Sequence, residues 1–255
     1  MLIVLPVSHI DVDAALRLAT RLRDAKGLAT VWLAATMQAS WDVGPIVDVL
    51  RSAPQFNYYR LPDECEEGWP ESANHMFYSL AQELARHENK EPWYFMEADN
   101  RPLQPCWLEA LQQEYIAAGK PYMGAVNDSR LTNLQTGETF IRGKHMVGTG
   151  VYPADFLSRC KTIDTVQNFA WDVHIGPEII HEVHDTKLIA HRFRTCNYRR
   201  EGSVLVCDNF EPKPYQHLYA APVSQEAVIL HGCKDDSLDK LLRPSEFAAS
   251  MPPEN

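Results

Sequence analysis

Short apolar runs alternate along this chain with stretches in which apolar residues recur every three or four positions. The runs predict buried strands, and the stretches between them predict amphipathic helices. Strands are expected at 2–7, 30–35, 56–61, 93–96, 121–126 and 227–230. Helices are expected to open near 11–13, 41–42 and 74, to span 107–118, and to follow Gly176-Pro177. This alternation indicates right-handed βαβ units and an α/β fold with a mostly parallel central sheet flanked by helices.

The strand at 93–96 is followed by two acidic residues, Glu97 and Asp99, and then by Asn100. Ligands of open α/β sheets gather at the carboxyl ends of the strands. Two carboxylates beside buried apolar surface are costly unless a cation meets them, and a hard divalent ion that itself holds phosphates would do so. The alternative is that these residues simply form a polar turn.

A second polar group follows the last expected strand. His231 and Lys234 lie three residues apart around Gly232. An imidazole and an ammonium at this spacing could serve a metal ion and its bound diphosphate together. The alternative is an ordinary polar strand end.

Two further stretches could contact a ligand. Gly148 and Gly150 permit close approach of the backbone to a bound molecule, although a strand interrupted by glycines explains them equally well. Asp172 stands beside Trp171 just ahead of an expected helix, where it is either a helix cap or a base or nucleophile. The stretch 127–144 is polar and rich in turn formers, which predicts an irregular loop or a hairpin.

Composition and charge narrow the class of protein. The 255 residues carry a formal net charge of −10, which argues against a protein that coats nucleic acid non-specifically. Six scattered cysteines, no signal sequence and no apolar run of membrane length indicate a cytoplasmic protein without a membrane partner. Four arginines nevertheless gather in one segment, either as a solvated face or as a contact for phosphate or nucleic acid: Arg192, Arg194, Arg199 and Arg200.

No G-x-G-x-x-G follows the first strand and no P-loop is present, so a nucleotide would need other anchors. Taken in order, the opening strand at 2–8, Glu97-Ala98-Asp99 and the late His231-Gly232-Cys233-Lys234 resemble the GT-A glycosyltransferases. The phrase at 96–103, followed by Trp107-Leu108, is similar to that family's pattern of acid, turn and helix. The resemblance covers roughly residues 1–240 and departs from the family in having Glu97 where the first acid is usually aspartate.

The resemblance implies a single GT-A-like, Rossmann-like domain at 1–243 and a tail at 244–255. Residues 1–126 would be the nucleotide-binding half, and 127–243 would complete the metal site and contact the acceptor. It implies Mn²⁺ or Mg²⁺ held by Asp99, Glu97 and His231, and a nucleotide-sugar donor, which we expect to be a UDP-sugar. Donor contacts are expected from Pro6, Val7, Ser8, Trp69, Asn74, Ala98, Gly232 and Lys234.

The acceptor or sugar would lie against Gly148, Thr149, Gly150 and Trp171. Asp172 would accept the acceptor's proton if the enzyme inverts, and Glu97 is a second candidate catalytic residue. The segments at 68–74 and 150–153 are similar to those of phage-encoded members, which would place the protein in the host cytoplasm. Some phage members glycosylate hydroxymethylated pyrimidines, so duplex DNA bound by the four arginines is one candidate acceptor.

Other acceptors and other functions are also compatible with the sequence. The acceptor could be a glycan or a small molecule, and a nucleotidyltransferase shares the sheet, the metal and the nucleotide. A non-catalytic domain would bind a nucleotide-sugar without turnover. A zinc enzyme could be built from histidines, although their spacing misses H-E-x-x-H: His174, His181, His184 and His191.

Overall fold

The apolar run at the N-terminus forms β1 (Leu2–Val7), and all six of its residues are buried. The computed structural model describes residues 1–24, 30–35, 42–51, 55–60, 70–132, 139–163, 170–210 and 218–242. A strand with no polar side chain cannot lie at a solvated edge without exposing apolar surface. In agreement with this, β1 has a parallel neighbour on each side, β2 (Thr30–Ala35) and β4 (Trp93–Phe95).

The large sheet has seven strands in the order β3-β2-β1-β4-β7-β6-β8. Its first four strands are parallel, β7 is antiparallel to both of its neighbours, and β8 is parallel to β6. The remaining strands are β3 (Gln55–Arg60), β6 (Tyr122–Thr132), β7 (Thr139–Tyr152) and β8 (Val183–Asp185). The expected α/β fold with a mostly parallel central sheet is therefore confirmed.

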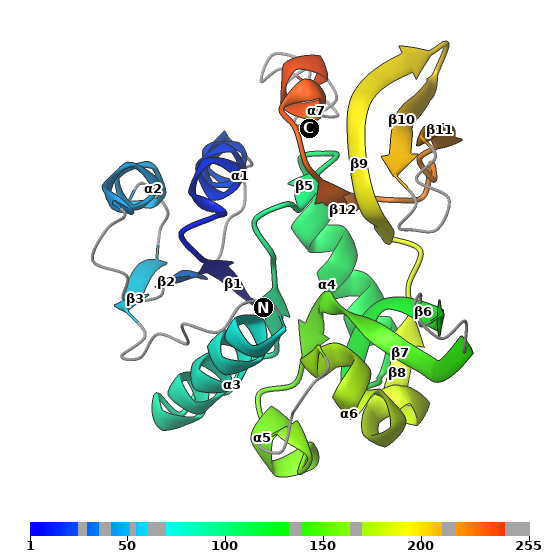
Figure 1. The fold of residues 1–255 in the computed structure, drawn as a ribbon. Coiled ribbons are helices and arrows are strands. Elements are labelled where there is room, and N and C mark those ends of the chain that lie inside the picture. The colour runs from blue at the N-terminus through cyan, green and yellow to red at the C-terminus, as the bar shows by residue number, and fades with distance from the viewer. Residues whose placement is uncertain are drawn as a thin grey trace.

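Helices cover both faces of this sheet (Figure 1). Side chains of a strand alternate between faces, and in β1 Ile3 and Leu5 enter one core while Leu2 and Val4 enter the other. The first core receives α1 (Val12–Asp24), α2 (Gly44–Leu50) and α4 (Trp107–Ala118). The second receives α3 (Glu71–Arg86), α5 (Phe156–Arg159) and α6 (Trp171–Ile179), which is followed by the 3₁₀ turn Ile180–Glu182.

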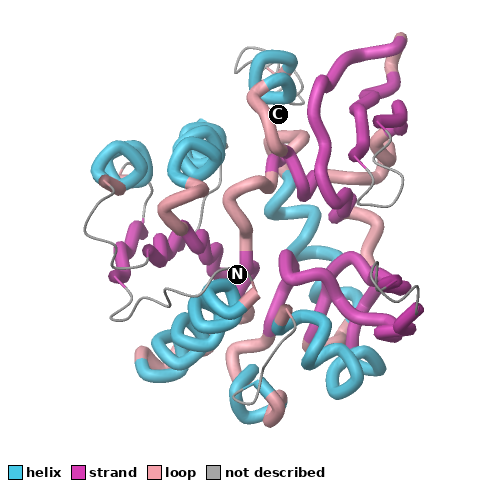
Figure 2. The backbone as a smooth tube through the Cα atoms, viewed as in Figure 1, coloured by secondary structure: helices cyan, strands magenta, loops and turns pink. Residues whose placement is uncertain are grey.

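A smaller five-stranded sheet has the order β11-β10-β9-β12-β5. Figure 2 shows β9, β10 and β11 of this sheet grouped at the upper right, beside the last helix, α7 (Ser237–Leu241). Its strands are β5 (Arg101–Pro102), β9 (Ile189–Glu201), β10 (Val204–Phe210), β11 (Leu218–Pro222) and β12 (Ile229–Cys233). Since β4 belongs to the large sheet and β5 to the small one, residues 96–100 join the two sheets.

Two local expectations differ from the structure. The last strand is β12, so His231 and Gly232 lie within it and not after it, because its pairing with β9 continues to Cys233. Gly176 and Pro177 lie inside α6, which begins earlier, at Trp171, and Asp172 therefore stands in the first turn of the helix. For 127–144 the hairpin is the alternative that agrees with the structure, because β6 and β7 pair as far as Thr132 and Thr139.

Some expectations cannot be compared with the structure. Trp69 and the tail at 244–255 lie outside the described residues. The division into halves at 126 and 127 stays a prediction. In the part of the chain that the structure describes, none of the helices combines the length and the apolar character needed to cross a bilayer.

Candidate metal centre

The loop at 96–100 leaves the carboxyl end of β4 and is fixed from several sides. Its first residue donates its backbone N–H to Val4 O at 2.8 Å, so the loop starts in register with the central strand. The Asn100 side chain is fully buried and donates to Glu97 O at 2.9 Å and to Thr149 Oγ1 at 3.0 Å. It also accepts a hydrogen bond from the Tyr94 hydroxyl at 3.3 Å. Asn100 thus closes the turn that presents Glu97 and Asp99.

The buried side chain of Arg101 holds the same loop through its backbone carbonyls. Its guanidinium is fully buried and donates to the carbonyls of Ala98 at 2.8 Å and Asn100 at 2.6 Å. It also donates to Ala14 O at 3.3 Å and to both oxygens of Asp239, at 3.1 and 3.0 Å. A buried guanidinium needs such a set of acceptors and one countercharge. Arg101 therefore ties the loop to α1 and to α7.

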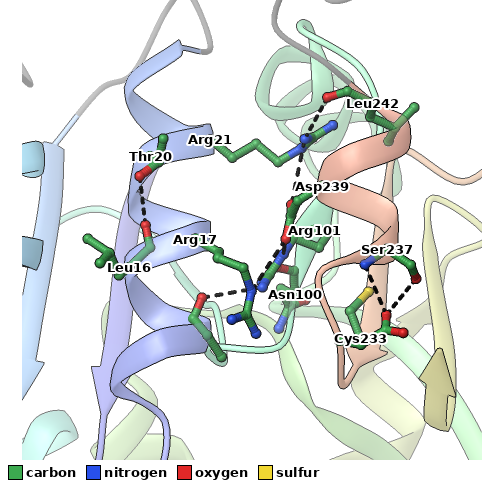
Figure 3. A network of polar contacts seen from close by, with 12 residues as sticks. Leu16, Arg17, Thr20, Arg21, Asn100, Arg101, Cys233, Ser237, Asp239 and Leu242 are labelled. Carbon is green, nitrogen blue, oxygen red and sulfur yellow. Dashed lines mark hydrogen bonds and ion pairs between the residues drawn. The ribbon is translucent and has the colours of Figure 1, made fainter. Parts of the chain in front are cut away.

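Two more arginines of α1 converge on the same carboxylate (Figure 3). Arg17 Nε lies 3.5 Å and Arg21 Nη1 3.7 Å from Asp239. Arg21 also donates to Pro102 O at 2.7 Å and to Leu242 O at 3.2 Å. Asp239 is thus the shared countercharge for three arginines and anchors α7 beside the loop.

His231 reaches the loop from the small sheet. Cys233 N donates to Asp99 O at 3.0 Å, which places β12 directly against the loop. The His231 Nε2 atom lies 3.2 Å from Glu97 Oε2 and 3.3 Å from Asp99 Oδ1. One ligand atom from each of these three residues lies within 4.8 Å of the others. The structure therefore brings together the three side chains expected to hold a metal.

The donor set fits a divalent cation. Asp99 Oδ1 is buried without a hydrogen-bond partner, although His231 Nε2 lies 3.3 Å away. Such an atom is costly unless something cationic contacts it, and the position that the imidazolium of His231 takes beside Oδ1 is one that a bound cation could share. Lys234 contacts the other oxygen, Oδ2, so Oδ1 is the atom that faces the centre. Two carboxylates and one imidazole suit Mn²⁺, and carboxylates with water suit Mg²⁺.

Charges within the centre are balanced. Burial by itself would raise the pKa of Asp99, but the charge of His231, together with the charge and hydrogen bond of Lys234, outweighs it and holds this pKa well below its usual range. Burial would likewise lower the pKa of His231, yet Asp99 and Glu97 raise it to about 10. The two carboxylates thus face an imidazolium and an ammonium, and the centre is electrostatically close to neutral.

Asp172 and Gly148 form a neighbouring group. The backbone N–H of Gly148 donates to Asp172 Oδ2 at 3.1 Å, and that of Val173 donates to Asp172 Oδ1 at 2.9 Å. Burial raises the pKa of Asp172; His145 opposes this rise, and the nearby charge of Glu97 adds to it. A carboxylate whose pKa is raised beside a second carboxylate is a candidate general base.

Trp171 is locked in place by packing. Its ring stacks on Phe77 with centroids 3.4 Å apart and an interplanar angle of 11°, within a cluster of aromatic side chains. The backbone N–H of Trp171 donates to Asn74 Oδ1 at 2.7 Å. Asn74, expected to contact the donor, is buried and uses this oxygen to hold the start of α6.

The end of β1 lies near the centre. Ser8 Oγ donates to Asp11 Oδ2 at 2.5 Å. Burial raises the pKa of Asp11, and after the opposing effect of Ser8 the charge of Asp99 raises it further. Pro6, Val7 and Ser8 thus lead toward the two carboxylates, as parallel pairing of β1 with β4 requires.

The four arginines of 192–200 lie on β9 and are engaged within the protein. Arg199 pairs with Glu201 and Asp208, each at 3.0 Å. Arg192 donates to Pro222 O at 3.3 Å. Arg194 and Arg200 also have contacts with the rest of the chain. A phosphate-binding role for this segment stays a prediction.

The four histidines of the zinc alternative do not come together. Among the described residues, which include all four, the group whose geometry could hold a metal ion is Glu97, Asp99 and His231. His184 instead contacts Glu114 at 2.9 Å.

Other residues near the centre had no local signal in the sequence. His191 lies beside His231. Burial and, further, the charge of Asp99 raise the pKa of Asp11, and His145 opposes the burial that raises the pKa of Asp172. Asp11 follows β1 at the sheet edge where β4 also ends, so parallel pairing could have indicated it. His191 depends on the register of β9 against β12, which the sequence does not show.

Gly148 provides a direct test of the geometry around Glu97. A Cβ atom added at Gly148 would lie 2.8 Å from Glu97 Oε1 and 3.1 Å from Trp171 Cζ2. Because Trp171 is stacked on Phe77, the carboxylate must move. We expect Gly148→Ala to weaken Mn²⁺ binding by about 10-fold, the lower end of the effect seen when ligand-orienting contacts are lost.

The control for this variant is Gly124→Ala. Its added Cβ would meet the flexible Met146 side chain at 2.7 Å and not Glu97. We expect it to change the unfolding temperature but not the affinity for Mn²⁺, measured by titration with the metal. Equal affinities for both variants would show that Gly148 does not set the position of Glu97.

Comparison with known proteins identifies the fold and not the family. No known protein-family profile matches the sequence, and no curated protein matches it. Among solved structures, apo WbbM, a bifunctional glycosyltransferase, is similar over 75% of this chain and 40% of its own, with a TM-score of 0.50 and 8% identity. At this identity the similarity concerns the α/β fold alone.

Two further structures are more distant. TarS from S. aureus is similar over 69% of this chain and 32% of its own, with a TM-score of 0.46 and 9% identity. A Bacillus anthracis protein assigned as a glucose-1-phosphate thymidylyltransferase, solved with sucrose, is similar over 72% and 85% of the two chains, with a TM-score of 0.43 and 8% identity. The chain spans well under two thirds of the WbbM and TarS chains.

Proposed function

We propose that the protein is a metal-dependent glycosyltransferase that moves a sugar from a nucleoside-diphosphate sugar to an acceptor hydroxyl. The observation that carries this proposal is the convergence of Glu97, Asp99 and His231 at the carboxyl end of β4, with a buried Asp99 oxygen that lacks a hydrogen-bond partner. The site lies in an α/β fold of the kind seen in WbbM, and open α/β sheets bind their ligands at this position.

In this proposal the protein stabilises the departing diphosphate. A divalent cation held by the three residues would supply positive charge where negative charge develops in the transition state. Lys234, whose side chain is 47% exposed, can turn from Asp99 toward a phosphate and add its own charge. Carbonyls and amides at the end of β1, around Pro6 to Ser8, would contact the nucleoside, which we expect to be uridine.

Asp172 is the proposed base for an inverting transfer. It lies beside Gly148, so an acceptor hydroxyl resting on the backbone of 148–150 would be within its reach. Its raised pKa favours proton uptake from that hydroxyl. Trp171 would form a rigid wall for the sugar, and a hexose is the expected group transferred.

The candidate acceptors remain a glycan, a small molecule or hydroxymethylated duplex DNA. DNA is supported only by the arginines of β9, the strand that also carries His191 next to the centre. Labelled sugar should enter hydroxymethylcytosine-containing duplex, but not unmodified duplex, if DNA is the acceptor. The salt dependence of DNA binding should then weaken when Arg200 is replaced by alanine.

The proposed function is tested by screening UDP-, GDP- and ADP-sugars for thermal stabilisation with and without Mn²⁺. A donor at 100 times its Kd should stabilise the fold by about 2.7 kcal/mol, which raises the unfolding temperature by several degrees. We expect this only with Mn²⁺ present, together with slow release of the nucleoside diphosphate. Release of pyrophosphate from a nucleoside triphosphate would indicate a nucleotidyltransferase instead, and no shift with any donor would contradict the proposal.

A further inference from the structure

His191 lies directly behind His231 on the neighbouring strand. β12 and β9 are parallel, and their register places His231 opposite His191. The Nδ1 atoms of the two rings are 2.9 Å apart, and the ring planes meet at 40° with centroids 4.9 Å apart. This distance is that of a hydrogen bond and not of a van der Waals contact. One of the two nitrogens must therefore carry the proton, and the other must accept it.

The opposite nitrogen of His231 decides which of them donates. His231 Nε2 faces Glu97 Oε2 at 3.2 Å and Asp99 Oδ1 at 3.3 Å. A cation bound there would take the place of the proton on Nε2, which then presents its lone pair, and the imidazole keeps its one remaining proton on Nδ1. A proton on His231 Nδ1 is then donated to His191 Nδ1, 2.9 Å away. The histidine pair thus has one arrangement that leaves Nε2 available to a metal.

We propose that His191 is a positioning residue for the metal centre: it accepts the hydrogen bond from His231 Nδ1–H and so turns Nε2 toward Glu97 and Asp99. This inference rests on the proposed function, because it assigns the partner behind the third metal ligand. Histidines that bind metals commonly donate their second N–H to a fixed acceptor, and loss of that acceptor weakens metal binding by about 10- to 100-fold.

The role requires an acceptor and not merely a side chain of suitable size. Asparagine can place its Oδ1 close to the position of His191 Nδ1, whereas leucine has similar bulk but no acceptor. His191→Leu and His191→Asn are therefore a matched pair. Neither substitution touches Glu97, Asp99 or His231 themselves.

The affinity for Mn²⁺ is measured by electron paramagnetic resonance, which quantifies the concentration of free Mn²⁺ and needs no substrate. We expect His191→Leu to bind Mn²⁺ at least about 10-fold more weakly than the wild type. His191→Asn should bind within a few-fold of the wild type. The unfolding temperatures of both variants in EDTA show whether the fold itself has changed.

The proton position is read independently in the wild-type protein. In protein loaded with diamagnetic Mg²⁺, ¹⁵N spectra should show that His231 carries its proton on Nδ1. This measurement stands even if His191→Leu does not fold. A proton on Nε2 in the loaded wild type would overturn the proposal.

The outcomes distinguish a failure of the proposed metal centre from a failure of the proposed role of His191. Wild-type protein that binds neither Mn²⁺ nor Mg²⁺ would overturn the metal centre and the role of His191 with it. Wild-type protein that binds Mn²⁺ with the same affinity as both variants would overturn the role of His191 alone. Equal weakening in both variants would show that only the packing of the ring matters, which also overturns it.

Discussion

Asp99→Asn is expected to abolish Mn²⁺ binding and to reduce transfer by about 1,000-fold or more. The amide keeps the shape of the side chain but removes the charge that the buried oxygen Oδ1 presents to the centre. Stabilisation of a leaving diphosphate by a bound metal amounts to several kcal/mol, and each 1.36 kcal/mol of barrier is about tenfold in rate. The measurements are Mn²⁺ affinity and release of nucleoside diphosphate from the donor found in the screen.

The fold should persist in this variant. Glu97 still faces His231, and Lys234 is half exposed and can turn toward solvent. The matched control is Asp48→Asn, since Asp48 is an exposed carboxylate of α2 paired only loosely with Arg51, at 3.3 Å. It should change neither metal affinity nor turnover. Full activity of Asp99→Asn in excess EDTA would end the case for a catalytic metal.

Arg101→Leu is expected to destabilise the protein by about 3–5 kcal/mol, the usual effect of removing one partner from a buried ion pair. The guanidinium is fully buried, so its loss leaves the carbonyls of Ala98 and Asn100 without their donor. It also removes from Asp239 its two shortest charged contacts. Urea unfolding followed by circular dichroism would measure the change in the free energy of unfolding.

Arg17→Leu is the control for this prediction. Arg17 contacts the same carboxylate, at 3.5 Å, but its side chain is 29% exposed and its charge is partly screened by solvent. Its loss should therefore cost about 1 kcal/mol or less. If both arginine variants lost the same stability, the loop would not depend on Arg101 more than on any other neighbour of Asp239.

The elements that the sequence predicts well are those whose pattern is local. β1, β2 and α4 have the bounds expected from their apolar runs and periodicity, because burial on both faces or on one stripe shows directly in residue order. The change from apolar to acidic residues after β4 indicated Glu97 and Asp99 for the same reason. His231 was paired with them through the order of motifs, and the structure brings the three together.

Features that depend on distant pairing could not be predicted. β5 has two residues and no pattern of its own, and it exists because β12 pairs with it. The contact between His191 and His231 follows from the parallel register of β12 against β9, in which these two residues are partners. The ion pair between Arg199 and Asp208 of β10 likewise depends on the pairing of β9 with β10, and a phosphate contact by Arg199 stays a prediction.

The loop that presents Glu97 and Asp99 is also the covalent bridge between the seven-stranded and the five-stranded sheet. An ion bound by both carboxylates and by His231 would connect this loop to β12 of the five-stranded sheet, and so would crosslink the two sheets non-covalently. Ion binding and the packing of the two sheets would then be thermodynamically linked. Whatever favours ion binding must equally favour the arrangement in which the five-stranded sheet holds His231 beside the loop.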